Sequence, residues 1–332
     1  MALTVDGRPA LVAAVGHLNL EGTEPLDPEA RFYAYSITKT FLAIAVLRLA
    51  EQGHLGLDDR LQAILPETPV DEPVTLRQVL NHTAGLPDYG SMAEYNEALR
   101  ADPGAPWTSD QFLTRTLRLG VRFAAGRSWA YSNIGFLLVR LVIERITQQP
   151  MPDALADLVF RPAGLRQTFV AESLADGHAL TPGYSAALDD DGDLRDVSHR
   201  YHPGWVAHGV AISTAPDLAR AMEHLLTGRL LDEPSMAAML TAVPVPDRHP
   251  LVVRPAYGLG LMVDLASPYG LVAGHAGGGP GYSAAAFHVP DVVGHRLTSV
   301  ALVNRDRPDL GMELAFALVD AFAARNEVPR PT

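Results

Sequence analysis

Residues 36–53 read SITKTFLAIAVLRLAEQG, and this stretch decides how the rest of the chain is interpreted. Its apolar side chains recur at helical spacing, and Gly53 supplies a residue at which a helix can end. Because the stretch is apolar on nearly every face, we expect a central helix that is buried on all sides. Ser36 and Lys39 lie three residues apart at its start, so a hydroxyl and an amine share one face within hydrogen-bond reach.

Lys39 stands out by composition, because 25 of the 26 basic residues are Arg and this one is Lys. An Arg keeps its charge at physiological pH, whereas a buried Lys can lose its proton near neutrality. A neutral Lys39 could take the proton of Ser36, and the N-terminus of the helix would favour the negative charge that develops. The simpler alternative is a serine N-cap followed by an ordinary lysine.

The tripeptide Tyr131-Ser132-Asn133 carries two more polar groups suited to this chemistry. In an extended segment, positions two apart point the same way, so Tyr131 and Asn133 can face one cleft. Tyr131 could then relay a proton, and Asn133 could bind both Lys39 and a substrate carbonyl. The alternative is a surface turn in which Asn133 caps the following helix.

The glycine-rich stretch GHAGGGPG covers residues 274–281. A phosphate-binding loop does not fit, because no Lys-Ser/Thr pair follows and the next segment is β-prone. Small residues suit a strand beside which a substrate lies, and a backbone N–H there could complete an oxyanion hole with the N–H of Ser36. A plain glycine-rich hairpin is the alternative.

Several other function classes are excluded by the sequence. It contains no G-x-S-x-G, no H-E-x-x-H and no G-x-G-x-x-G after a strand, so we expect neither an α/β-hydrolase nor a zinc or dinucleotide enzyme, and no cofactor. With 26 basic and 38 acidic residues the net charge is −12, which argues against nucleic acid or an anionic membrane surface as partner. The absence of Cys excludes disulfides and a cysteine nucleophile.

The location of the protein is expected to be the cytoplasm. The most apolar run, residues 41–50, is too short to span a bilayer and contains Arg48. Asp6 and Arg8 interrupt the apolar stretch that a secretion signal would need. We therefore expect a soluble protein that does not bind a membrane, and no motif specifies its oligomeric state.

The two ends of the chain are β-prone and its middle is helical. Strands are expected at residues 3–5 paired with 10–20, and at 257–264, 271–275, 283–289 and 297–303, before a helix over 310–324. The clearest helices between them are 76–81, 109–118, 134–146 and 215–226. This order predicts an α/β (α+β) fold with one sheet built from both chain ends. Residues 1–57 and 205–332 would form the sheet domain, and residues 58–204 a mainly helical insert.

Taken together, S-x-x-K at residues 36–39, Y-x-N at 131–133 and H-x-G at 275–277 resemble the motifs of the penicillin-recognising serine hydrolases. That family includes class C β-lactamases, D-Ala-D-Ala carboxypeptidases, D-aminopeptidases and β-lactamase-like esterases. Residues 79–87, VLNHTAGLP, and 210–219, VAISTAPDLA, are similar to further segments of it. The resemblance implies a β-lactamase-like fold, in which an antiparallel sheet flanked by helices meets an all-helical domain at the site.

The resemblance also implies a role for each motif residue. Ser36 would be the nucleophile, and Lys39 with Tyr131 would shuttle its proton. The backbone N–H groups of Ser36 and Gly278 would form the oxyanion hole. Where other members have Lys, this chain has His275, so the cation that binds a substrate carboxylate is expected to be weaker or pH-dependent, which argues against a dedicated β-lactamase. The residues expected to bind substrate are Asn133, His275, Gly277 and Gly278.

The expected function is hydrolysis of an ester or amide of a small or medium acyl substrate or short peptide, through an acyl-enzyme on Ser36. Acyl transfer or peptide cyclisation is the first alternative, a β-lactamase the second and a non-turnover acyl sensor the third. Loops over residues 88–107 and 186–205 are expected to form the pocket walls, because loops on a rigid scaffold carry specificity. Trp107, Tyr201 and Trp205 could line an apolar acyl pocket or pack in the core. His82 is expected to be structural.

Overall fold

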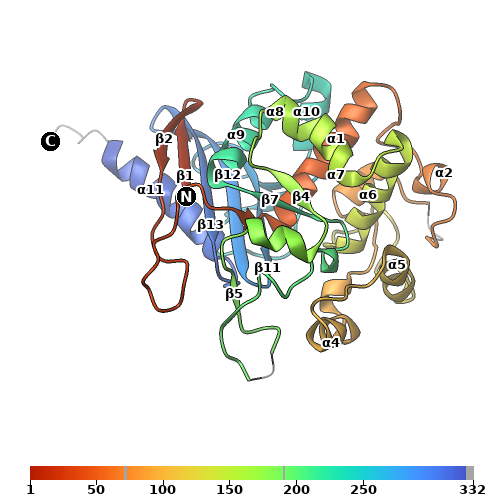
Figure 1. Cartoon of the computed structure of the whole chain (residues 1–332). Coiled ribbons are helices and arrows are strands. Elements are labelled where there is room, and N and C mark those ends of the chain that lie inside the picture. The colour runs from red at the N-terminus through yellow and green to blue at the C-terminus, as the bar shows by residue number, and fades with distance from the viewer. Residues whose placement is uncertain (71–72, 190, 327–332) are drawn as a thin grey trace.

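The computed structural model describes residues 1–70, 73–189 and 191–326. Its centre is an eight-stranded antiparallel sheet in the order β2-β1-β13-β12-β11-β10-β9-β8 (Figure 1). β1 pairs with β13, so the N-terminal hairpin extends a sheet formed by the C-terminal segment, as the sequence predicts. The strands are β1 (Ala2–Val5), β2 (Arg8–Val12), β8 (Val243–Pro244), β9 (Pro255–Tyr257), β10 (Met262–Asp264), β11 (Val272–Gly279), β12 (Tyr282–Val292) and β13 (His295–Val303).

Helices cover both faces of this sheet. On β12 the side chains of Phe287 and Val289 pack against α11 (Leu310–Asn326). Their neighbours Ala284 and Ala286 face the opposite way, into the main core that holds α9 (Ala215–Leu226) and α1 (Thr38–Glu51). This alternation is the two-residue period of a strand that is buried on both faces.

The central helix of the main core is α1, of whose 14 residues 11 are buried. It packs against α6 (Asn133–Thr147), which is the other long helix of that half. The prediction of a central buried helix is therefore confirmed. The remaining helices are α2 (Leu61–Ile64), α3 (Leu76–Leu80), α4 (Ala93–Ala101), α5 (Ser109–Leu117), α7 (Met151–Leu155), α8 (Arg161–Ala163) and α10 (Glu233–Leu240).

The segment expected to be all-helical also contains short strands. β4 (Phe169–Ala171) joins β3 (Phe32–Tyr33) and β7 (Val210–Ser213) in a three-stranded sheet. β5 (Tyr184–Ser185) pairs with β6 (Arg195–Asp196). Strands of two or three residues are too short to leave an alternating pattern, so the sequence does not reveal them. The proposed domain boundaries after residues 57 and 204 stay a prediction.

Three predicted element limits are wrong in detail. Residues 257–264 are not one strand: they run from the end of β9 at Tyr257 into β10, and these two strands pair because the chain turns at Gly258–Gly260. Gly260 has a φ of +67°, and a Cβ there would lie 2.6 Å from the Cβ of Ala43 on α1, so the turn needs glycine for both conformation and space. β2 ends at Val12 rather than at residue 20, and β11 continues to Gly279. Among the described residues no helix combines the length and the apolar character needed to cross a membrane.

Candidate active site

Ser36 lies in a 3-10 turn (Tyr35–Ile37) that connects β3 to α1. The residue before it, Tyr35, has a φ of 44°, in the left-handed region that non-glycine residues rarely adopt. The Tyr35 hydroxyl donates to the carbonyl oxygen of Pro280 at 2.5 Å and so ties this turn to the end of β11. A strained residue fixed by its surroundings is a common feature next to reactive groups.

Lys39 lies one helical turn further along, as the S-x-x-K spacing predicts, and its side chain is buried. Its Nζ lies 3.1 Å from the Oγ of Ser36 and 2.8 Å from the Oδ1 of Asn133. Burial lowers the pKa of Lys39 to about 7, although the charge of Asp88 partly opposes the shift. Near neutral pH a substantial fraction of Lys39 therefore carries a free lone pair that can accept a proton.

Tyr131 contacts the same serine from the other side. Its hydroxyl donates to the Oγ of Ser36 at 3.0 Å, and the Nζ of Lys39 lies 4.9 Å from its ring centroid. Burial raises the pKa of the Tyr131 phenol, so it keeps its proton at neutral pH. Ser36, Lys39 and Tyr131, which are far apart in the sequence, thus form one connected group.

Asn133 is the first residue of α6, and the helix is capped by the side chain of Ser132 rather than by Asn133. The Asn133 amide is therefore free to face Lys39. Asp88 holds it there: one carboxylate oxygen accepts from the Asn133 backbone N–H at 2.7 Å, and the other lies 3.4 Å from its side-chain Nδ2. With the NH2 group directed at Asp88, the amide oxygen points at Lys39.

The glycine-rich strand β11 passes directly beside the nucleophile. A Cβ on Gly277 would overlap the carbonyl oxygen of Ala34 and would lie 2.9 Å from the backbone nitrogen of Ser36. Only a residue without a side chain allows this approach. A Cβ on Gly278 would meet nothing within 4 Å, because that position faces open space in the cavity. Oxyanion binding by the N–H groups of Ser36 and Gly278 stays a prediction.

His275 lines the same cavity but does not supply the cation that the sequence suggests. Its Nδ1 lies 2.5 Å from the carbonyl oxygen of Ala276 and must donate, so its Nε2 accepts from the hydroxyl of Tyr257 at 2.7 Å. Burial, with a smaller contribution from the charge of Lys39, lowers the pKa of His275 to about 3. The ring is therefore neutral at physiological pH, and the expected pH-dependent cation is absent because the site is buried.

The imidazole ring of His82 packs between aromatic side chains. Its ring centroid lies 4.3 Å from that of Tyr131 and 4.6 Å from that of Tyr257. Its Nδ1 accepts from the backbone N–H of Ser132 at 3.2 Å. These contacts fix the position of Tyr131, which fits the structural role expected for His82.

Ser36, Tyr131, Asn133 and glycines 277–279 of β11 line a cavity of about 990 Å³. Both expected wall segments contribute to it, although the first contains helix α4 where the sequence suggests a loop. Tyr201 and Trp205 line the cavity, whereas Trp107 packs in an aromatic cluster with Tyr95 and Trp205. The cavity-lining residues from the two wall segments include Tyr89, Tyr95, Leu99, Arg100, Ala187, Tyr201 and Trp205.

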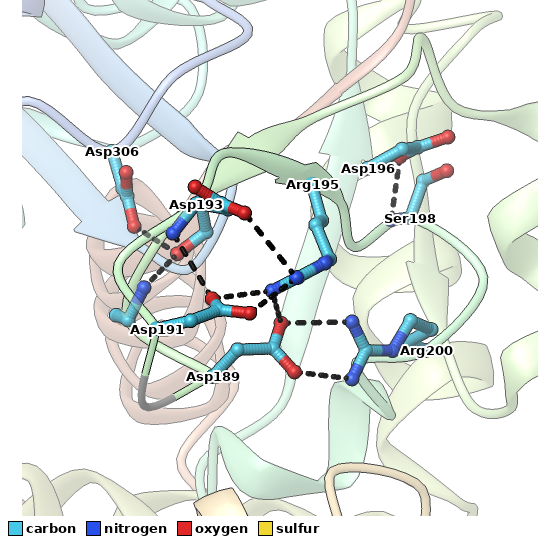
Figure 2. A network of polar contacts seen from close by, with 10 residues as sticks. Asp189, Asp191, Asp193, Arg195, Asp196, Ser198, Arg200 and Asp306 are labelled. Atoms are coloured by element: carbon cyan, nitrogen blue, oxygen red, sulfur yellow. Dashed lines mark hydrogen bonds and ion pairs between the residues drawn. The ribbon is translucent and has the colours of Figure 1, made fainter.

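The second wall segment is held by a network of ion pairs, which Figure 2 shows. Asp189 accepts from both guanidinium nitrogens of Arg200 at 3.0 Å, and Arg195 lies between Asp189 and Asp191. Ser185 donates to Asp306, which lines the cavity from the segment before α11. The ion pairs lie at the surface and are individually weak. Together with the part-buried Ser185–Asp306 bond, they restrict the loop that carries Tyr201 and Trp205.

Sequence reasoning missed three groups that contact the motif residues, one of which is Tyr257, the partner of His275. Asp88 falls in the predicted wall loop without being singled out, and His208 lies in no catalytic motif. The Nε2 of His208 is nevertheless 3.2 Å from the Nζ of Lys39. Among the described residues, no group of three or more His, Cys, Asp or Glu side chains is placed to hold a metal ion.

A serine hydroxyl placed between a buried amine and a phenol, beside a glycine-rich strand, defines a site equipped for nucleophilic chemistry at serine. The chain belongs to the beta-lactamase family, whose sequence profile matches residues 1–323. The predicted family and the predicted antiparallel, helix-flanked fold are thereby confirmed.

The names of individual relatives indicate several different activities. The chain is 27% identical over 304 residues to penicillin-binding protein 4* of Bacillus subtilis (strain 168), which covers 88% of this chain and 64% of that protein. It is 33% identical over 215 residues to esterase EstB of Burkholderia gladioli, covering 61% of this chain and 53% of that protein. The solved structure of a D-stereospecific amidohydrolase from Streptomyces sp. superposes with a TM-score of 0.76 at 29% identity, over 95% of this chain and 93% of that one. The chain thus spans between about half and two thirds of the length of these two curated relatives.

Proposed function

We propose that the protein is a serine hydrolase that cleaves an ester or amide bond of a small or medium acyl substrate through an acyl-enzyme on Ser36. The observation that carries this proposal is the hydrogen-bond chain from Tyr131 through Ser36 to Lys39. Burial lowers the pKa of Lys39 to about 7, which supplies a base for the serine proton at neutral pH.

In acylation, the Oγ of Ser36 forms a bond to the substrate carbonyl carbon while its proton passes to the lone pair of Lys39. The carbonyl π electrons move onto the oxygen, where the N–H groups of Ser36 and Gly278 are the proposed donors. The intermediate collapses, the bond to the leaving group breaks, and the leaving group takes the proton from Lys39 by way of Tyr131. Water then adds to the acyl carbon and gives a proton to Lys39. The bond between that carbon and the Oγ of Ser36 breaks, and Oγ takes the proton from Lys39 as the acid leaves.

The electrostatics of β11 favour substrates without a free carboxylate. His275 is neutral, and residues 276–279 are alanine and glycine, so this strand offers neither a cation nor a hydroxyl beside Ser36. A carboxylate placed there would lose its hydration without gaining a partner. Esters, amides and peptides cleaved near their amino terminus are therefore favoured as substrates. β-Lactams and peptides cleaved near their carboxyl terminus carry a free carboxylate and are disfavoured.

The acyl group is expected to be apolar. Leu99, Tyr201 and Trp205 form an apolar and aromatic part of the cavity wall, and such walls bind hydrocarbon or aromatic groups. The relative named as a D-stereospecific amidohydrolase supports the inclusion of D-amino acid amides among the candidates. A short peptide is a further candidate, and the cytoplasm remains the proposed location, which cell fractionation tests.

An acyltransferase or peptide cyclase is the second candidate, because a cavity of about 990 Å³ can hold an amine or alcohol acceptor beside the acyl group. Such an acceptor would attack the acyl-enzyme in place of water. A β-lactamase would find no cation on β11 beside Ser36, and a non-turnover sensor would not require the intact proton chain through Tyr131.

The test compares wild type with Ser36→Ala on p-nitrophenyl acetate, p-nitrophenyl butyrate, D-alanine p-nitroanilide and nitrocefin. Ser128→Ala, which alters an exposed serine outside the cavity, is the matched control. We expect turnover of esters or the anilide in wild type and control, and none in Ser36→Ala. Equal turnover by Ser36→Ala would overturn the proposal.

Two additions to the same assay separate the alternatives. Product ratios with an added amine distinguish transfer from hydrolysis, and free acid at every amine concentration eliminates the transferase. Intact mass after exposure to penicillin tests the sensor, for which a long-lived adduct without turnover is the signature.

A further inference from the structure

His208 is a buried histidine that the mechanism above does not use. It lies between the 3-10 turn Pro203–Trp205 and β7, and only 1% of its surface is exposed. Its Nε2 is 3.2 Å from the Nζ of Lys39, and its ring borders the cavity. Its Nδ1 has no hydrogen-bond partner within the part of the chain that the structure describes. The Lys39 contact is therefore the polar contact that determines how this ring is protonated.

The neighbours of Lys39 can be matched one by one to the groups of a neutral amine, which has two N–H donors and one lone pair. The Oδ1 of Asn133 can only accept, so it takes one N–H. If Nδ1 of His208 carries the ring proton, its Nε2 accepts the second N–H. The lone pair then points at the remaining neighbour, the hydroxyl of Ser36.

The other tautomer gives the opposite result. A proton on Nε2 of His208 would be donated to the lone pair of Lys39, and the second N–H of Lys39 would turn to the Oγ of Ser36. The Ser36–Tyr131 pair would then be left with one hydroxyl hydrogen that has no acceptor among these contacts. The first tautomer in turn leaves the buried Nδ1–H of His208 without a partner, so each tautomer has one unpaired donor. The ammonium form of Lys39 separates them: its three N–H groups need three acceptors, which are the Oδ1 of Asn133, the Oγ of Ser36 and the Nε2 of His208. A proton on Nε2 would oppose one of these N–H groups donor to donor, so the first arrangement is favoured.

We propose that His208 is a positioning residue, protonated on Nδ1, that accepts a hydrogen bond from Lys39 and thereby directs the lysine lone pair at Ser36. The proposal rests on the serine-hydrolase function proposed above. It assigns no bond-making step to His208, since none of the proton transfers proposed above passes through this ring.

The surroundings keep His208 neutral, so that Nε2 stays available as an acceptor. Burial lowers its pKa well below the usual value, and the charge of Lys39 acts in the same direction. Four further titratable or charged groups face this pair: His82, Asp88, Arg140 and His275. Only Asp88 favours a proton on Lys39, and burial outweighs it.

The first test reads the tautomer directly and needs no turnover. Protein labelled with 15N-histidine is examined by two-bond 1H–15N correlation above the Lys39 pKa of about 7, and the His208 signals are assigned by their loss in His208→Gln. We expect a protonated Nδ1 and an unprotonated Nε2. A protonated Nε2 would overturn the proposal, even if the hydrolase function holds.

The second test asks whether His208 acts on Lys39. In His208→Leu we expect kcat on p-nitrophenyl acetate to fall by about 10²-fold with KM unchanged. The lone pair of Lys39 would no longer be held toward the Ser36 hydroxyl, and this changes the orientation of the base without changing the contacts that bind substrate. The acid limb of kcat/KM should also move to lower pH, because an acceptor for the ammonium has been removed. His208→Gln keeps an acceptor near the position of Nε2 and should restore both.

His288→Leu is the control for the His208→Leu measurement. His288→Leu applies the same substitution to a buried histidine that bonds to Thr298 instead, so it should lower Tm without moving the acid limb. An unmoved acid limb in folded His208→Leu, or a lost rate in folded His208→Gln, contradicts the proposal. If His208→Leu does not fold, His208→Gln and the tautomer decide. If wild type shows no Ser36-dependent turnover, the hydrolase function fails, and the tautomer alone decides the role of His208.

Discussion

Gly277→Ala is the perturbation that tests most directly whether the approach of β11 to Ser36 matters. The added methyl would overlap the carbonyl oxygen of Ala34 and lie 2.9 Å from the backbone nitrogen of Ser36. Neither atom belongs to a flexible side chain, so the strand and the Ser36 turn must move apart by about 1 Å to restore ordinary contact.

Gly277→Ala should lower both the stability of the fold and the catalytic rate. Overpacking of this kind costs about 1–3 kcal/mol. Unfolding entropy is about 2.1 cal/mol/K per residue, or roughly 0.7 kcal/mol/K for 332 residues. The expected loss in Tm is then about 1.5–4 °C. For catalysis, a displacement of about 1 Å of an oxyanion donor should lower kcat/KM by about 10²–10³-fold, far more than the change in stability implies.

The assay compares Tm and kcat/KM on p-nitrophenyl acetate for wild type, Gly277→Ala and Gly278→Ala. Gly278→Ala is the matched comparison for stability, because its methyl would meet nothing within 4 Å. We expect Gly278→Ala to keep the wild-type Tm and Gly277→Ala to lose both stability and activity. A Gly277→Ala enzyme with wild-type Tm and wild-type kcat/KM would refute the reasoning.

Three further predictions concern the proton chain. The base must be neutral to accept a proton and burial lowers the pKa of Lys39 to about 7, so kcat/KM should rise with pH through a midpoint near 7; a flat profile would contradict this. Tyr131→Phe removes the donor to Ser36 and should lower kcat by about 10²–10⁴-fold with little change in Tm, and undiminished turnover would exclude the relay. Asp88→Ala frees the amide of Asn133 and removes the acceptor of its backbone N–H. Thermal unfolding should show a loss of about 1.5–3 kcal/mol together with slower turnover, whereas an unchanged kcat would show that Asp88 does not orient the amide.

The parts of the site that the sequence predicts are those fixed by local geometry. Ser36 and Lys39 meet because they lie three positions apart where the 3-10 turn leads into α1. Tyr131 and Asn133 both line the cavity, two positions apart where an extended segment leads into α6. Long periodic segments such as α9 and α11 are predicted for the same reason. Strands of two or three residues, such as β4, are held by tertiary contacts and leave no pattern.

The parts that the sequence does not predict depend on packing between distant segments. The contact between Lys39 and His208 joins residues 169 positions apart, and that between Asp88 and Asn133 joins residues 45 apart. No spacing rule connects them, so only the fold reveals them. The residue type at 275 is visible in the sequence, but its charge depends on burial and on Tyr257, which the sequence does not show.

The use of lysine at position 39, in a chain that otherwise uses only arginine as its permanent cation, follows from the geometry of the site. None of the arginines in residues 1–70, 73–189 and 191–326 is buried, whereas Lys39 is completely buried. An arginine there would keep its charge without a counter-ion in direct contact, which would destabilise the fold, and it could not take a proton from Ser36. A lysine can lose its proton, so it can be buried without a charge and can then accept the proton of Ser36. The burial that would make a permanent cation costly is therefore the same property that turns Lys39 into a base.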